Sequence, residues 1–112
     1  MAVTYTKKDV ARRTAEAVGE KIYLTETLVD GFFDTLREMM SEDEDRIRIE
    51  IRNFGVFEVK PTKAKPRARN PRTNEEIYVP PRKKTHFKPG KLLREVLKKP
   101  LDSWDNPGKI ED

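Results

Sequence analysis

Hydrophobic residues recur every three or four positions between residues 6 and 40, and they alternate with polar residues between 46 and 60. The first spacing is typical of one face of an α-helix and the second of a β-strand. A first helix is predicted to begin after Thr6, whose hydroxyl can cap it, with Asp9 adding negative charge in the first turn. It is predicted to end at Gly19, which can adopt the left-handed conformation.

A second helix is predicted to begin at Thr25, with Leu24 and Val29 forming a hydrophobic staple across the cap. Its apolar side chains form a stripe two residues wide, which presents more apolar surface than the first helix can cover. We therefore predict a core that is shared between two chains. A cofactor pocket is not expected, because no polar ligand interrupts the stripe. The apolar stripe comprises Leu28, Val29, Phe32, Phe33, Leu36, Met39 and Met40.

Three strands are predicted after these helices. Residues 46–52 alternate with period two, Asn53-Phe54-Gly55 makes a turn, and residues 56–60 return as the second strand of a hairpin. The third predicted strand is 76–79, which ends at a pair of prolines that cannot donate to a sheet. A short helix over residues 91–97 follows Gly90. This order of elements indicates an α+β fold.

Prolines separate the second and third predicted strands. Pro61, Pro66 and Pro71 would weaken a central strand, but they suit a protruding two-stranded arm whose edges face solvent. We call residues 60–84 the basic arm. Its charge is concentrated: residues 60–99 carry 14 Lys/Arg against 3 Asp/Glu, although the net charge of the whole chain is only +4. Such clustering is typical of a surface that binds a polyanion and releases its counterions.

Composition limits the class of protein. At 112 residues the chain is expected to form one domain with a small core of its own. It has no cysteine, hence neither a disulfide nor a thiolate metal site. Neither an apolar signal core nor a membrane-length apolar run is present, so we expect a cytoplasmic protein. An enzyme is not expected, because the single histidine, His86, has no nucleophile to serve and no metal-ligand spacing occurs.

The middle of the basic arm combines a guanidinium, an amide and a rigid ring in Arg69-Asn70-Pro71. Proline has a fixed φ and no N–H to desolvate, so it can act as a wedge between base pairs. The alternative is that Pro71 only sets the first corner of a turn in which Asn74 is the later left-handed residue. Both roles can hold at once.

Three ordered blocks of this sequence resemble the bacterial histone-like HU and integration host factor (IHF) family of DNA-bending proteins. They are residues 53–59 (NFGVFEV), 69–77 (RNPRTNEEI) and 87–93 (FKPGKLL). The resemblance implies an intertwined dimer, with a helical base and a three-stranded antiparallel sheet that extends into a two-stranded DNA-binding β-arm. It also implies that two such arms embrace duplex DNA in the minor groove and that Pro71 intercalates and kinks it.

By the same resemblance, Arg69 is the minor-groove arginine and Asn70 is its neighbour at the tip. No cofactor is implied, and the protein would associate with the bacterial nucleoid. Asn53 and Asn74 stand where the family usually has glycine, and the loop 41–45 is longer and more acidic than usual. The phosphate contacts implied by the resemblance are Lys60, Lys65, Arg82, Lys83, Lys88, Lys91 and Arg94.

We expect a protein that binds DNA with low sequence specificity. The alternative is a site-specific IHF-like subunit, since readout through DNA deformability leaves no mark in a protein sequence. Less favoured is an RNA- or ribosome-binding module, for which only Tyr78 offers an aromatic platform. The partner subunit is identical in a homodimer or different in a heterodimer.

The predicted DNA-binding domain spans residues 1–99, and residues 100–112 form an acidic tail with a net charge of −3 from 1 Lys/Arg and 4 Asp/Glu. Two interpretations of the tail are nearly balanced. It docks through Trp104 and Ile110 and weakens DNA binding, or it is a disordered solubilising end.

Overall fold

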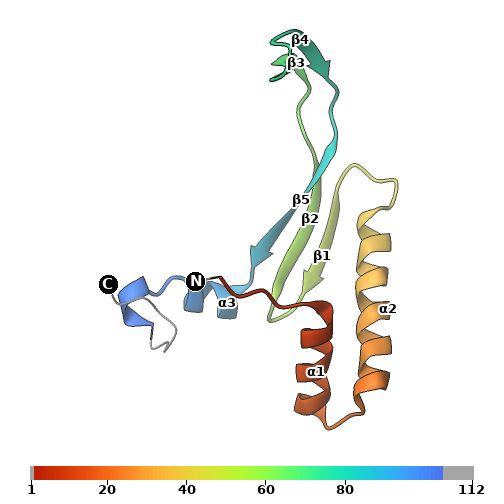
Figure 1. The fold of residues 1–112 in the computed structure, drawn as a ribbon, viewed down its shortest axis with the longest axis vertical. Coiled ribbons are helices and arrows are strands. Elements are labelled where there is room, and N and C mark those ends of the chain that lie inside the picture. Colours follow the sequence, from red (N-terminus) through yellow and green to blue (C-terminus); the bar gives the residue numbers. More distant parts are fainter. Residues whose placement is uncertain (1, 105–112) are drawn as a thin grey trace. The chain divides into compact units, whose positions relative to one another are not determined.

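A computed structural model describes residues 2–104 of the chain (Figure 1). This part of the chain divides into two compact units, one that contains the first two helices and one that comprises residues 43–99. The elements, in chain order, are α1 (Lys7–Val18), α2 (Ile22–Met40), β1 (Ile47–Ile51), β2 (Gly55–Pro61), β3 (Lys65–Arg69), β4 (Glu76–Val79), β5 (Lys83–Pro89), α3 (Lys91–Leu97) and a 3₁₀ turn (Leu101–Ser103).

Helix α1 begins and ends where its capping residues predict. The Thr6 hydroxyl accepts a hydrogen bond from the Asp9 amide at 3.3 Å, and the Asp9 carboxylate accepts one from the Thr6 amide at 2.8 Å. Together they form a capping box. At the other end Gly19 has a φ of 69°, which is the left-handed conformation. The predicted first helix is therefore confirmed at both ends.

The predicted start of α2 is wrong. The helix begins at Ile22, with Lys21 as an N-cap that makes no side-chain hydrogen bond, so Thr25 lies inside the first turns. The Thr25 hydroxyl donates to the Lys21 carbonyl at 2.9 Å, four residues back along the helix. This bond satisfies the hydroxyl within the helix, and Thr25 is buried where α1 and α2 pack together.

In the second unit, β1, β2 and β5 form an antiparallel sheet in the order β1-β2-β5. Ile47 lies opposite Val59, Ile49 opposite Phe57, and Phe57 opposite Phe87, so these side chains share one face. The ring centroids of Phe57 and Phe87 are 4.9 Å apart. The predicted isoleucine face is thus confirmed and is extended by an aromatic pair.

The third strand of this sheet is β5, whereas the sequence predicted residues 76–79 for that position. Residues 76–79 form β4, which pairs instead with β3 in a separate two-stranded sheet. Strand β5 was missed because residues 83–89 are mostly basic and end at Pro89, so their own β-propensity is low. Pairing with β2 along its whole length, from Gly55–Pro89 to Pro61–Lys83, supplies the stabilisation that local propensity lacks.

The β1–β2 turn and the start of α3 are joined by a close backbone contact. Asn53 turns the chain with a φ of 67°, which asparagine tolerates better than most residues. The Gly90 amide donates to the Phe54 carbonyl at 2.8 Å, immediately before α3. Helix α3 covers the predicted residues and begins after Gly90, as expected.

The predicted tail is described only as far as Trp104, after the 3₁₀ turn that follows Pro100. Ile110, the second proposed docking residue, lies outside the described residues. Docking of the tail therefore stays a prediction.

Candidate nucleic-acid interface

The basic arm begins as a continuation of the sheet (Figure 1). Strands β2 and β5 stay paired as far as Pro61 and Lys83. The next pair, Thr62 and Arg82, is joined by two hydrogen bonds: the Thr62 amide donates to the Arg82 carbonyl at 2.6 Å, and the Arg82 amide donates to the Thr62 hydroxyl at 2.9 Å. We call this pair the neck. Beyond it the chain continues into β3 and β4.

Strands β3 and β4 form the outer part of the arm. Lys65 lies opposite Val79 and Ala68 opposite Ile77, and the register shifts between these two pairs. Such an irregularity increases the local twist and bends the strand that carries it. The predicted protruding two-stranded arm is therefore present, with β3 and β4 as its strands.

The tip of the arm is a compact turn in which Pro71 is exposed. The Asn70 side chain accepts a hydrogen bond from the Arg72 amide at 2.9 Å and so bridges Pro71. The Asn74 amide donates to the Asn70 carbonyl at 2.7 Å, and Asn74 has a φ of 59°. Asn74 is thus the left-handed residue that the sequence predicted, and Asn70 fixes the turn that presents the Pro71 ring.

Arg69 lies across this tip. Its guanidinium donates to the Asn74 carbonyl at 3.0 Å and is 3.6 Å from the Glu76 carboxylate. Both charged side chains are more than half exposed, so the ion pair is weak. These contacts hold the guanidinium against the turn that carries Pro71, and the side chain stays accessible to an anion.

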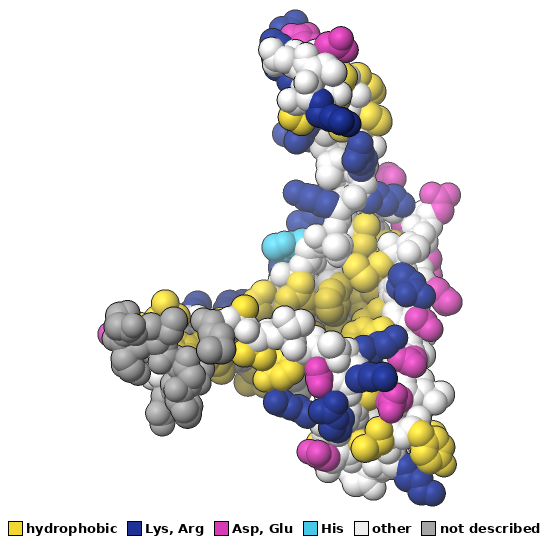
Figure 2. Space-filling view, viewed as in Figure 1, with side chains coloured by type: hydrophobic (Ala, Val, Ile, Leu, Met, Phe, Trp, Pro, Cys, Tyr) yellow, Lys and Arg dark blue, Asp and Glu magenta, His cyan; other side chains and the backbone are white. Residues whose placement is uncertain are grey.

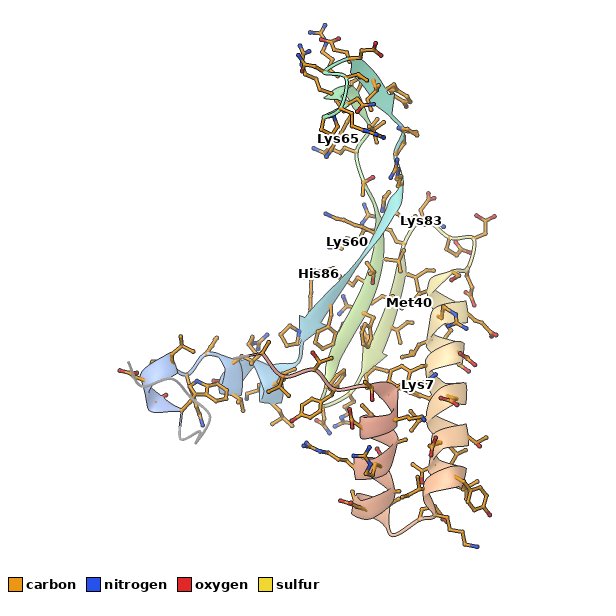
Figure 3. All side chains as sticks on the ribbon, in the orientation of Figure 1. Lys7, Met40, Lys60, Lys65, Lys83 and His86 are labelled. Carbon is orange, nitrogen blue, oxygen red and sulfur yellow. The ribbon has the colours of Figure 1, made fainter. Side chains whose placement is uncertain are left out.

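Basic side chains continue from the tip to the sheet, as Figure 2 shows for one face of the molecule. Among the implied phosphate contacts, Lys65 begins β3, Arg82 lies at the neck and Lys83 begins β5, and all three are exposed. Figure 3 shows Lys60 and Lys83 near the base of the arm, with Lys65 beyond them. Lys60 lies on β2 and Lys88 on β5, whereas Lys91 and Arg94 lie on α3.

The sheet face opposite the isoleucines carries charge. At its centre the Glu58 carboxylate lies 3.0 Å from the Lys88 ammonium, 3.5 Å from the Lys60 ammonium and 3.3 Å from the Arg48 guanidinium. The close contact with the Lys88 ammonium lowers the pKa of Glu58; burial opposes this effect and the charge of Lys60 reinforces it. Two of the implied phosphate contacts therefore have a carboxylate partner on the protein.

Sequence reasoning missed Glu58 and Lys84 as members of this charged face. Lys84 lies opposite Lys60, and His86 lies opposite Glu58. The period-two alternation of Lys84, His86 and Lys88 was the available signal, since alternate residues of a strand share a face. That signal became readable only once residues 83–89 were known to be a strand.

Within residues 2–104 no group of histidine and acidic side chains is placed to hold a metal ion. No helix in this range has the length and apolar character needed to cross a membrane.

Comparisons with known proteins place this arrangement in a family. The family model described as bacterial DNA-binding protein matches residues 5–98. The DNA-binding protein HU of Thermotoga maritima is 36% identical over 93 residues, which cover 83% of this chain and 99% of the relative. The alpha subunit of integration host factor from Hahella chejuensis is 35% identical over 89 residues, covering 80% and 85% of the two chains.

A solved structure is similar in fold as well as in sequence. A cocrystal structure of Anabaena HU with DNA matches this chain with a TM-score of 0.74 and 27% identity, covering 86% of this chain and 100% of the other. The matched family is a family of DNA-binding proteins and not of enzymes. The chain belongs to the bacterial DNA-binding protein family that includes HU and integration host factor.

Proposed function

We propose that this architectural DNA-binding protein acts as a dimer whose two basic arms grip duplex DNA in the minor groove and bend it by intercalating Pro71. One observation carries the proposal most directly: Pro71 is exposed at the tip of the arm, inside a turn that the Asn70 side chain fixes and that the Arg69 guanidinium contacts at the Asn74 carbonyl. A rigid apolar ring presented in this way can enter a base step with little loss of conformational entropy.

The distribution of charge supports a grip on the DNA backbone. Lys65, Arg82, Lys83, Lys91 and Arg94 are exposed and come from the arm, the neck and α3. Lysine and arginine side chains that neutralise phosphates supply affinity without reading sequence. Anabaena HU, which was crystallised with DNA, shares the fold of this chain, and this similarity supports duplex DNA as the proposed ligand. The site of action would be the bacterial nucleoid.

Exposed apolar side chains support the dimer. In the described chain Leu28 is 64% exposed and Phe32 51% exposed, whereas the buried hydrophobic residues are Ala11, Ala15 and Val59. A core of this size cannot stabilise a folded domain by itself. A second chain would cover the apolar stripe of α2. The family match over residues 5–98 supports a DNA-binding domain within residues 1–99 and a separate tail over 100–112.

Bending of the DNA by Pro71 and binding of its phosphates by basic side chains can be tested independently. Pro71→Ala should reduce the bend of a duplex labelled at both ends, measured by energy transfer, and leave the salt dependence of binding nearly unchanged. Lys83→Ala should leave the bend nearly unchanged. It should make the plot of log K against log salt less steep by about 0.9, the value for one neutralised phosphate.

A nicked duplex provides the control, because the break in one strand makes a base step easier to unstack. The wild-type protein should bind it more tightly than intact duplex, and the defect of Pro71→Ala should largely disappear. Equal bending of intact DNA by Pro71→Ala and the wild type would show that Pro71 is only a turn residue. Preference for RNA over duplex DNA in direct competition would instead favour an RNA-binding module.

Site-specific binding is the second candidate function, because alpha subunits of integration host factor are about as similar to this chain as the Thermotoga HU protein is. We propose low sequence specificity, since phosphate contacts make up most of the implied interface. Selection from a random pool of duplexes distinguishes the two: a recovered consensus sequence would favour the site-specific function.

A further inference from the structure

Glu58 lies beneath two of the basic side chains of the proposed DNA-binding surface. Its side chain is only 12% exposed, whereas those of Lys60 and Lys88 are 36% and 51% exposed. Both ammonium groups contact the same carboxylate oxygen, Oε1, at 3.5 and 3.0 Å, and this oxygen is buried. The carboxylate is therefore the inner layer of the cluster, and the two ammonium groups form the outer layer.

This layering brings together two positive charges that would otherwise repel each other. Lys60 and Lys88 come from adjacent strands, β2 and β5, and each is attached through a long, flexible side chain. A shared carboxylate offsets their repulsion and restricts both side chains. The positive charge of Arg48 is partly neutralised by Glu50, because the Arg48 guanidinium also donates to the Glu50 carboxylate at 2.7 Å.

An anion can be added to this arrangement without removing Glu58. Each lysine ammonium has three N–H donors, so one can point inward to Glu58 while others remain for an outer ligand. With Glu58 counted against Lys60 and Lys88, the group keeps a net charge of +1, so it still attracts an anion. A phosphate approaching from solvent meets the ammonium groups before it could reach the buried Oε1.

We propose that Glu58 is a positioning residue that holds Lys60 and Lys88 together as one seat for a single backbone phosphate of DNA. Glu58 stays in place when DNA binds. This inference rests on the proposed function and deepens it, because it assigns one phosphate to a pair of lysines and a role to an acidic residue in a basic interface.

A pair of charge-matched variants tests the positioning role in the full-length protein. Glu58→Gln and Glu50→Gln each remove one negative charge from the same face of the sheet, but only the first removes the partner of Lys60 and Lys88. Glu50→Gln should bind a duplex slightly more tightly than the wild type at low salt, because net charge rises. Glu58→Gln should bind about 3- to 10-fold more weakly than Glu50→Gln, since two lysines must then be ordered by the DNA itself.

The inference would be overturned if Glu58→Gln bound the duplex as tightly as Glu50→Gln, or more tightly, while thermal unfolding showed that it is folded. It would mean that Glu58 only repels DNA. Should Glu58→Gln fail to fold, the lysines provide the second test, because they leave the carboxylate in place.

The second test counts phosphates. If Lys60 and Lys88 share one phosphate, Lys60→Ala or Lys88→Ala alone should change the salt slope little. The double variant should reduce the magnitude of the slope by about 0.9. A fall of about 1.8 in the double variant would mean two separate phosphates and would overturn the shared seat. In both tests, a wild-type protein that does not bind duplex DNA contradicts the proposed function, whereas normal wild-type binding with the opposite variant results contradicts only this inference.

Discussion

Gly55 begins β2 at a point where strand β5 passes too close for any side chain. A Cβ atom placed on Gly55 would lie 2.5 Å from the Lys88 carbonyl oxygen and 2.6 Å from the Phe87 ring. The Lys88 carbonyl belongs to the backbone of a paired strand, so it cannot move away without disturbing the sheet. We predict that Gly55→Ala lowers the free energy of unfolding by about 1 to 3 kcal/mol, measured by urea denaturation.

Gly31 offers a matched control for this change. It lies within α2, and a Cβ atom there would meet nothing within 4 Å in the described chain. Gly31→Ala should therefore raise stability by about 1 kcal/mol through helix propensity, which is the opposite sign. A Gly55→Ala protein as stable as the wild type would show that β2 and β5 can separate at this end without cost.

The capping box of α1 makes the stability of the protein depend on pH. The pKa of Asp9 is lowered from its ordinary value of 3.8, first by the hydrogen bond from the Thr6 amide and then by that from the Thr6 hydroxyl. A carboxyl whose pKa is lower in the folded protein stabilises it above the ordinary pKa, and this contribution is lost as the pH falls through the lowered value.

Asp9→Asn should accordingly be less stable than the wild type at neutral pH, and the difference should shrink as the pH falls below 3.8. Urea denaturation of both proteins across the acid range measures the difference. A gap that stays constant with pH would mean that the charge of Asp9 contributes nothing to the helix start.

The elements that the sequence predicted correctly depend on local chemistry. Thr6, Asp9 and Gly19 define α1 through contacts within a few residues, and Asn74 reveals a left-handed turn in the same way. The two errors have non-local causes. Thr25 has the identity of a cap but packs inside α2, and β5 is a strand because β2 lies beside it.

The same distinction applies to the candidate site. The tip of the arm was readable because Asn70, Pro71 and Asn74 interact across a short turn. The cluster around Glu58 was not, because its members come from β1, β2 and β5 and meet only when the register of the sheet is known. Sequence spacing shows where charge is abundant, but pairing of strands decides which charges neutralise one another.

The exposed apolar stripe of α2 predicts an obligate dimer. Sedimentation should show dimer at micromolar concentration, and the melting temperature should rise with protein concentration because folding and association are linked. Phe32→Ala should lower the free energy of unfolding by about 2 to 5 kcal/mol, as expected for truncation in a core.

Tyr23→Ala is the control for Phe32→Ala, since Tyr23 also lies on α2, is 69% exposed and is outside the stripe. It should change stability by less than about 0.5 kcal/mol. A folded monomer at micromolar concentration would contradict both the shared core and the grip by two arms.

The neck of the basic arm has a consequence for the lifetime of the protein. Thr62 and Arg82 join the sheet to β3 and β4 through two hydrogen bonds, and Pro61, Pro80 and Pro81 on either side of them have no amide to add. Local opening of the outer arm therefore costs less than unfolding of the sheet. Its many lysines and arginines then offer cleavage sites to a protease of tryptic specificity, whereas in the proposed complex DNA covers the same bonds. Turnover of this protein would thus depend on occupancy: copies bound to the chromosome would be spared, and copies in excess of the available DNA would be cut first at the arm.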